Sequence, residues 1–180
     1  IVSAVLVSFI WVFIFTNAMP ALGGALGWDW LANISWFGTP SMATVTIIVV
    51  SIWQNIGFLM IIYTAGLQTI PEDVMESAEL DGCSGLKKVL KIELPLLMPT
   101  VTINLFVSIS GAFKSFDIPN AMTGGGPYGS TMPVAMNIYQ EAFTKYNLGY
   151  GSAKSVILFL TVAAVTLIQL YCTRKKEVEY

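Results

Sequence analysis

The spacing of charged residues constrains this chain more than any other feature of its sequence. Residues 30–71 contain no Asp, Glu, Lys or Arg, and neither do residues 1–28, 94–113 or 155–173. A helix of about 20 apolar residues crosses the roughly 30 Å hydrocarbon core of a bilayer, and each of these windows can hold one such helix. Strands of a membrane barrel alternate over about 10 residues, and the sequence has no such alternation. The sequence therefore predicts helices that span a membrane.

The overall composition agrees with a membrane protein and excludes several kinds of function. Charged residues make up 11% of the chain, less than half of the usual quarter, which is too little to cover a water-soluble globule. The absence of histidine excludes imidazole catalysis and histidine metal sites. Cys83 and Cys172 lie too far apart for a metal-binding motif, and the net charge of −2 argues against a nucleic-acid partner. Because the chain opens on Ile1 inside an apolar run, we expect it to be part of a longer protein.

We expect four spans, at about residues 1–19, 41–67, 95–112 and 152–171. The first connector, residues 20–40, is rich in glycine and tryptophan. The spacing of Gly23 and Gly27 matches a helix-packing motif, but because both lie outside the predicted span we favour the interpretation as loop glycines. Residues 68–94, called the polar loop below, hold the only strongly polar stretch. Residues 113–149, called the long connector below, are mixed in character and are predicted to contain a short helix over residues 134–143.

Basic residues indicate the orientation of these spans. Four spans place the polar loop and the C-terminal tail on the same side of the membrane, and six of the nine basic residues lie there: Lys87, Lys88, Lys91, Arg174, Lys175 and Lys176. Cytoplasmic loops carry an excess of Lys and Arg. We therefore expect the polar loop and the C-terminus to be cytoplasmic, and the other two connectors to face outward.

The polar loop is predicted to fold as two short helices. Thr69, with Glu72 three residues later, matches a capping box, and Pro71 suits a first helical turn. Gly82 can end the first helix because glycine readily adopts a positive φ. We expect the second helix over residues 85–93. From these residues alone, an ordinary solvated loop is an equal alternative.

The polar loop also carries a longer pattern, Glu76-Ser77-Ala78, then Gly82, then Ile92-x-Leu94-Pro95. It resembles the EAA signature of permease subunits in binding-protein-dependent ABC importers, with Ser77 in place of the first alanine. Three further segments resemble the carbohydrate-importer branch of that family: residues 36–40, 65–71 and 122–127. Such subunits have six or more spans. The four predicted here resemble the last four, so the resemblance implies that N-terminal helices are missing from this chain.

The resemblance implies a fold, a role and partners. The chain would be an all-α membrane protein, a partial transmembrane permease domain over residues 1–180, and would form half of the pathway for a sugar or oligosaccharide. Its partners would be a second permease subunit, an ABC ATPase dimer, an extracytoplasmic sugar-binding protein and the lipid bilayer of a bacterial inner membrane. The chain lacks a Gly-x-x-x-x-Gly-Lys-[Ser/Thr] motif. ATP and Mg²⁺ would therefore be used by the separate ATPase, and this chain would bind no cofactor and catalyse no reaction.

The polar loop would then be the coupling helix that docks on the ATPase, through Glu76, Ser77, Ala78, Asp81 and Gly82. The residue types agree with this role. Glu76 can pair with a basic residue of the partner, Ala78 permits a close backbone approach, and Gly82 sets the bend. In such importers, closure of the ATPases on ATP moves the coupling helix and changes the accessibility of the pathway.

A sugar pathway needs polar groups and aromatic faces within apolar spans, and intramembrane polar residues indicate function by default. Hydrogen bonding between helices is the alternative explanation for them. The resemblance to maltose-type permeases places substrate contacts at Ser51, Trp53, Asn55, Phe58, Lys114 and Ser115, although most residue identities differ there. Lys114 is also spaced to pair with Asp117.

Two other classes of function remain at this stage. A secondary transporter driven by an ion gradient usually needs a coupling acid within a span or paired broken helices, and none of the eleven acids lies in the middle of a predicted span. A membrane-embedded enzyme would lack both histidine and an acid pair at membrane depth. The sequence therefore favours an ATP-driven importer subunit, with a secondary transporter as the alternative.

Overall fold

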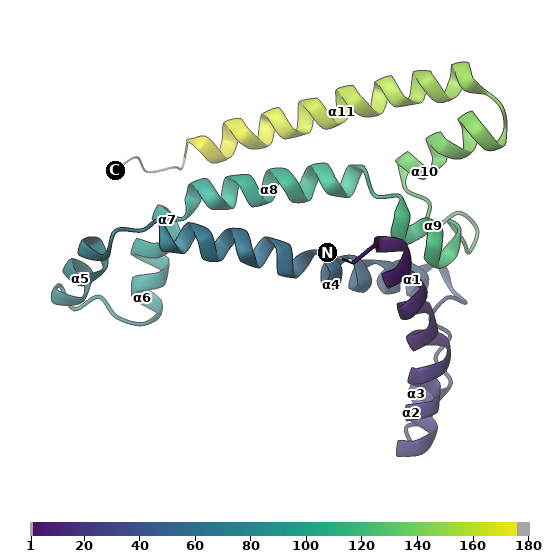
Figure 1. Ribbon diagram of the computed structural model, residues 1–180, viewed down its shortest axis with the longest axis horizontal. Helices are drawn as coiled ribbons and strands as arrows, with labels where there is room; N and C mark the ends of the chain where they lie inside the picture. Colours follow the sequence, from purple (N-terminus) through teal and green to yellow (C-terminus); the bar gives the residue numbers. More distant parts are fainter. Residues whose placement is uncertain (1, 176–180) are drawn as a thin grey trace. The chain divides into compact units, whose positions relative to one another are not determined.

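The computed structural model describes residues 2–175, and these residues form helices and turns without a strand (Figure 1). The α-helices of the N-terminal half are α1 (Ala4–Phe13), α2 (Met19–Leu26), α3 (Asp29–Ala32), α4 (Pro40–Gln68), α5 (Glu72–Leu80) and α6 (Leu86–Lys88). Those that follow are α7 (Leu94–Leu96), α8 (Met98–Phe113), α9 (Asp117–Thr123), α10 (Val134–Tyr139) and α11 (Leu148–Arg174). Three π-helical turns, η1 (Ile14–Ala18), η2 (Val89–Glu93) and η3 (Gln140–Thr144), interrupt them.

The chain divides into two compact units, which we describe separately. Unit 1 comprises the residues up to Asn55 together with Phe113–Leu158, and unit 2 comprises Ile56–Ala112 and the residues from Phe159 onward. The long helices α4 and α11 each contribute one part to each unit. The polar loop lies wholly in unit 2, and the long connector lies wholly in unit 1.

Three helical segments are long and apolar enough to cross a membrane: Ala4–Leu26, Pro40–Gln68 and Leu148–Arg174. A fourth crossing would have to combine Leu86–Leu96 with Met98–Phe113, a pair bent by 71°. Helix α8 alone has 16 residues and would extend about 24 Å at 1.5 Å per residue, less than the core of a bilayer. The bend lies at Leu97. Pro99 favours it because proline has no N–H to donate to the carbonyl four residues earlier.

The first long segment continues through Pro20 to Leu26, seven residues beyond the predicted end of the first span. A proline inside a helix removes one hydrogen bond, and here the backbone adapts through the π-helical turn η1 immediately before it. The helix ends at Gly27, whose φ is +68°. The structure therefore assigns to a helix a segment that the sequence suggested to be part of a connector.

The interpretation of Gly23 as a loop glycine is wrong. Gly23 lies within α2, where a Cβ atom would stand 2.5 Å from the backbone nitrogen of Ala32. Only a residue without a side chain lets α3 fold back so closely. Gly23 is thus a helix-packing glycine, and Gly27 is the left-handed residue that ends the helix.

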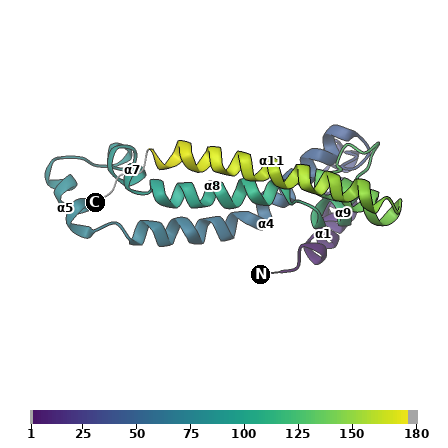
Figure 2. The same cartoon turned by 90° about the horizontal axis from the view of Figure 1, so that it is seen from above.

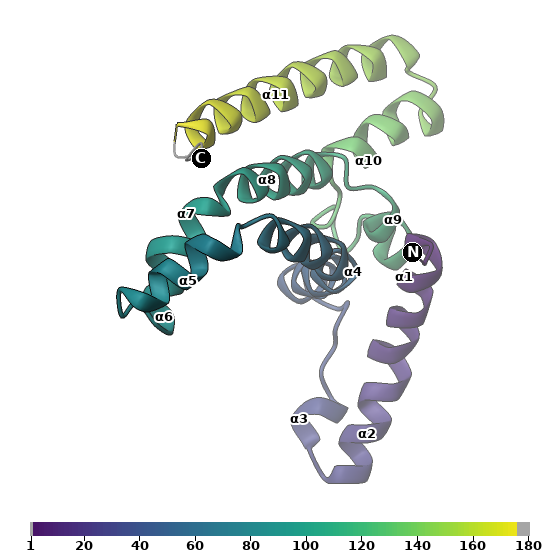
Figure 3. The same ribbon diagram turned by 60° about the vertical axis from the view of Figure 1, so that its left-hand side comes forward.

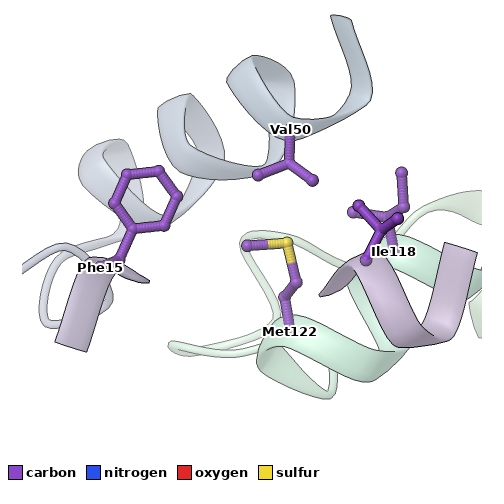
Figure 4. Close-up of a cluster of buried hydrophobic side chains, with 5 residues drawn as sticks. Phe15, Val50, Ile118 and Met122 are labelled. Atoms are coloured by element: carbon purple, nitrogen blue, oxygen red, sulfur yellow. The ribbon is translucent and has the colours of Figure 1, made fainter. Parts of the chain in front are cut away.

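The core of unit 1 is an apolar cluster built from α1, η1, α4 and α9. Val7, Phe15, Val50, Ile118 and Met122 are each at most 8% exposed, and Figure 4 shows Phe15 of η1, Val50 of α4 and the α9 residues Ile118 and Met122 converging. Further aromatic rings surround Phe15, which packs against Trp11, Trp36 and Phe37 with centroids 4.8–6.2 Å apart. This core fixes the first half of α4 against α1 and α9.

Unit 2 consists of the second half of α4, α8, the second half of α11 and the polar loop. Figures 1 and 2 show α8 between the other two long helices. Gly66 of α4 is buried against Thr100 of α8, and a Cβ atom at position 66 would lie 2.8 Å from the Thr100 Cβ. The two helices that flank the polar loop are therefore packed closely just before they enter it.

Candidate functional site

The polar loop is the first candidate site, and its first helix begins differently from the prediction. Pro71 is the N-cap residue of α5, and no side chain caps this end. The Thr69 hydroxyl instead donates to the Gly66 carbonyl at 2.7 Å, on the preceding helix α4. The predicted capping box therefore does not form, because Pro71 takes the N-cap position and Thr69 lies two residues before it.

Gly82 ends α5 as the sequence predicts, and main-chain hydrogen bonds make the bend. The Cys83 N–H donates to the Ala78 carbonyl at 2.9 Å, and the Gly82 N–H donates to the Glu79 carbonyl at 3.0 Å. These are the two bonds of a Schellman motif, which requires a left-handed residue. Gly82 supplies it with a φ of +71°.

The returning half of the loop is α6 followed by the π-helical turn η2, which together cover most of the predicted second helix. Figure 3 shows α5, α6 and α7 grouped at one end of unit 2. Lys88 of α6 donates to Glu79 of α5 at 2.7 Å. This hydrogen bond, with the accompanying charge attraction, lowers the pKa of the Glu79 carboxyl. The ion pair joins the two arms of the loop beside the Gly82 bend.

Apart from three buried residues, Ile70, Ala78 and Cys83, the polar loop is largely uncovered. Leu80 is 89% exposed and Leu86 is 73% exposed. An open hollow of about 740 Å³ lies between the two arms, lined by Glu79, Gly82, Ser84, Gly85, Lys88, Val89 and Glu93. The polar loop therefore presents apolar as well as charged surface.

The five residues predicted to couple to an ATPase lie together on α5 and its C-terminal end. Glu76, Asp81 and Gly82 are exposed. Ser77 is also exposed, and its hydroxyl donates to the Asp73 carbonyl of its own helix at 2.7 Å. Ala78 is only 6% exposed, covered by this chain itself. Leu80, which the sequence analysis did not single out, presents the largest apolar surface of this group.

The residues of the predicted substrate pathway fall on two elements. Ser51, Trp53, Asn55 and Phe58 lie on α4, and Lys114 and Ser115 lie in the link between α8 and α9. Asn55 Nδ2 donates to the Ser51 carbonyl at 2.8 Å, and the Trp53 ring meets Trp11 edge-on at 5.5 Å. Within the described residues, no hydrogen bond or ring contact joins Lys114 or Ser115 to Ser51, Trp53 or Asn55.

The predicted pairing of Lys114 with Asp117 is absent from the ion pairs of residues 2–175. Lys114 lies in the turn that follows α8, and Asp117 is the first residue of α9. The spacing rule for such pairs assumes one continuous helix. Because the helix is broken between them, the rule does not apply here.

A second charged cluster, not anticipated from the sequence, centres on Glu141 in the long connector. Glu141 is 8% exposed and accepts hydrogen bonds from Asn147 at 3.1 Å, Lys145 at 3.2 Å and Lys154 at 3.3 Å. These bonds, that of Asn147 foremost, lower the pKa of the Glu141 carboxyl. Lys154 also donates to Asn137 at 2.9 Å. The i, i+4 spacing of Glu141 and Lys145 could have predicted their pairing from the sequence. The contributions of Asn137 from α10 and Lys154 from α11 could not be predicted, because Lys154 is distant in sequence from both Asn137 and Glu141.

The chain was then compared with known proteins. The family described as binding-protein-dependent transport system inner membrane component matches residues 1–178. Over 99% of the chain, it is 35% identical to AmyD of Thermoanaerobacterium thermosulfurigenes, a probable starch degradation products transport system permease protein. Over the same share it is 33% identical to MsmF of Streptococcus mutans, a multiple sugar-binding transport system permease protein. The chain spans 61% of the length of each of these two relatives.

A solved structure shares the fold. It is a crystal structure of a bacterial ABC transporter involved in the import of the acidic polysaccharide alginate, with a TM-score of 0.85 and 20% sequence identity. The match covers 97% of this chain and 61% of the solved chain. Together with the three or four segments able to cross a membrane, this confirms the predicted all-helical membrane fold.

Proposed function

The chain belongs to the family of binding-protein-dependent transport system inner membrane components, and on that basis we propose that it is part of the permease subunit of an ATP-driven sugar importer. A second permease subunit, a dimer of ABC ATPases and an external sugar-binding protein would complete the transporter. ATP and Mg²⁺ would act in the ATPases, and this chain would carry out no covalent chemistry. The protein would lie in a bacterial inner membrane, with the polar loop and the C-terminus in the cytoplasm.

One observation carries this proposal, namely the uncovered polar loop between two closely packed helices. The bend at Gly82 needs no partner, since it is closed by main-chain bonds. Yet Glu76, Leu80 and Asp81 on the same helix point no side chain into a core of this chain. A loop that is fixed in shape and uncovered is suited to transmit movement from a docked protein. Because main-chain hydrogen bonds hold its conformation, the loop moves as a unit when the docked protein moves.

The proposed docking surface combines charge with apolar contact. Glu76 and Asp81 would meet basic residues of the ATPase, and Leu80, at 89% exposure, would enter an apolar recess. Ala78 and Cys83 are buried under the helix and support it. ATP-driven closure of the ATPases would move this surface and switch the pathway between inward-facing and outward-facing states. A ligand shifts such an equilibrium only by its differential contact with the two states.

For the substrate we propose a sugar or oligosaccharide, in line with the sugar transport systems to which AmyD and MsmF are assigned. The pathway would be lined by Ser51, Trp53, Asn55 and Phe58 of α4 and by Lys114 and Ser115. Trp53 and Phe58 are 55% and 51% exposed, which leaves part of each residue's surface open to a sugar face, although the Trp53 ring also contacts Trp11. The side-chain Nδ2 of Asn55 donates to the Ser51 main-chain carbonyl, and its side-chain oxygen Oδ1 would accept a hydrogen bond from a sugar hydroxyl.

Cysteine cross-linking tests the docking surface. The full-length subunit would carry Leu80→Cys with Cys83 and Cys172 replaced by serine, and would be co-expressed with its neighbouring permease and ATPase genes. We expect a specific cross-link to the ATPase whose yield changes at least about threefold when ATP is added. Tyr128→Cys, 97% exposed in the long connector that the proposed orientation places on the outer side of the membrane, is the matched control and should give none. An assembled, active complex without any cross-link from Leu80 would refute the proposal.

A further inference from the structure

Two amide side chains in unit 2, the buried Asn104 and the half-buried Gln169, are only half satisfied. Asn104 of α8 is 3% exposed, and its Nδ2 donates to the Leu59 carbonyl of α4 at 3.4 Å. Gln169 of α11 donates through Nε2 to the Thr102 carbonyl of α8 at 3.3 Å and to Thr173 of its own helix at 3.2 Å. Within the described residues, neither amide oxygen has a hydrogen-bond partner. Each amide therefore reaches a main-chain carbonyl of the neighbouring helix and leaves its own oxygen unpaired.

This arrangement is poorly explained by stability alone. A buried polar atom without a partner is unfavourable in an apolar environment. Hydrogen bonds between membrane helices contribute little on average. A leucine at either position would fill a similar volume and leave no acceptor unpaired. The helices that the hydrogen bonds of Asn104 and Gln169 connect indicate another role for these residues.

The bonds join three helices in series, α11 to α8 and α8 to α4. Helices α4 and α8 are the two that enter and leave the polar loop, and Gly66 and Thr100 hold them close at that end. The loop and these three helix segments belong to one compact unit. Single buried polar groups are well attested as devices that fix the register of packed helices.

We propose that Asn104 and Gln169 are positioning residues that lock the register of α4, α8 and α11, so that the polar loop and these helix segments move as one body. The inference rests on the proposed function, because it concerns movement imposed by the ATPase. Each directional bond resists sliding along the helix axis, which apolar packing alone permits. When the loop is displaced, α11 is then displaced with it, although α11 is not adjacent to the loop in the sequence.

Distance measurement between two spin labels tests this directly and needs no knowledge of the substrate. The full-length subunit, assembled with its second permease and ATPases in proteoliposomes, would carry labels at the exposed Cys172 of α11 and at Lys87→Cys in the loop. Cys83→Ser removes the third site, and cysteines outside residues 1–180 are replaced. Spectra are recorded without nucleotide and with ATP in the absence of Mg²⁺, which prevents hydrolysis.

In the otherwise unsubstituted subunit we expect the distance between the labels to change by less than half a helical turn, about 2.7 Å, between the two states. In the Asn104→Leu/Gln169→Leu variant we expect a shift of at least about one turn, 5.4 Å, or a comparably broadened distribution. The melting temperature of the variant should equal that of the parent. Asn17→Leu is the matched control, because the Asn17 amide is exposed and donates only to Thr16 of its own helix.

Two results would overturn the inference. One is an ATP-dependent shift of a full turn in the unsubstituted subunit, which would show that the helices slide; this measurement does not depend on whether the variant folds. The other is a variant that assembles and keeps the parental distance in both states. The Leu80→Cys cross-link separates the two proposals. If it forms and responds to ATP while either result is seen, only the one-body inference fails, and if it never forms, the proposed function fails first.

Discussion

The two connectors of this chain differ in what covers them. The long connector (residues 113–149) has an interior of its own, with Ile118, Met122, Met136 and Glu141 all at most 8% exposed. The polar loop (residues 68–94) buries little beyond Ile70, Ala78 and Cys83, and leaves Leu80 and Leu86 open. Both have defined helices and turns, so order does not distinguish them. The long connector therefore covers its own apolar side chains, whereas the polar loop leaves Leu80 and Leu86 uncovered by the described residues.

The ion pairs of the two connectors also differ in exposure. Glu79 is 66% exposed at its side chain and has a single partner, Lys88. Glu141 is 10% exposed at its side chain and has three charged or amide partners. Exposed ion pairs contribute little to stability, whereas a buried charge depends on all of its partners. The pair in the polar loop can therefore be exchanged for contacts with a partner, and the cluster in the long connector cannot.

The largest effect is expected where the long connector packs against α11. A Cβ atom at Gly151 would stand 2.7 Å from the Ala142 Cβ and 3.1 Å from its Cα, so Gly151→Leu should separate η3 from α11. Overpacking of this kind destabilises by about 1–3 kcal/mol, sometimes more. Thermal unfolding in detergent, followed by tryptophan fluorescence, measures the change. Gly149→Leu is the control because nothing lies within 4 Å of its Cβ position; equal losses in both variants would contradict the packing described here.

Acid pH should separate the two glutamates. The lowered pKa of Glu141 means that its contribution is complete above the ordinary carboxyl pKa, about 4.3, and is lost as the pH falls through the lowered value. We expect the melting temperature to fall across this acidic range. The melting temperature of Glu141→Gln should be lower than that of the parent at pH 7 and should fall less as the pH is lowered. The melting temperature of Glu79→Gln should follow that of the parent at every pH, because the Glu79 ion pair is exposed. Parallel pH curves for all three proteins would refute the comparison.

The smallest effect is local to the polar loop. Gly82→Ala places a side chain at a φ of +71°, a conformation that costs an L-residue about 1–2 kcal/mol. The space around Gly82 is open, so the strain should open the turn without disturbing the rest of unit 2. Hydrogen exchange of the Cys83 amide, which bonds to Ala78, should accelerate by about 5–30-fold. Ser84→Ala is the control and should leave this rate unchanged. An unaltered rate in Gly82→Ala would show that the turn does not depend on glycine.

The helical membrane fold could be predicted because it depends on long uncharged windows, a property of composition along the chain. The end of α5 could also be predicted, since only Gly82 offers a favourable left-handed residue there. The start of α5 could not. Thr69 and Glu72 have the spacing of a capping box, but α5 begins only after Pro71, and the Thr69 hydroxyl donates to the Gly66 carbonyl at 2.7 Å.

The structure of the long connector was harder to predict from the sequence, because it depends on contacts between elements that are distant along the chain. Helix α9 packs against α1 and α4, and the Glu141 cluster depends on contacts between α10, η3 and α11; no local pattern encodes either set of contacts. The half-satisfied amides of Asn104 and Gln169 became visible only with the neighbouring helices in place. Local signals identified where elements lie, and packing determined which side chains act together.

The bend at Gly82 has a consequence for how such proteins diversify. Main-chain bonds from Gly82 and Cys83 close the turn, and glycine contributes no side chain to it. The outward residues of α5, among them Glu76 and Leu80, are consequently not needed to hold the turn. Mutations can remodel that surface to match a changed partner while the scaffold beneath it persists.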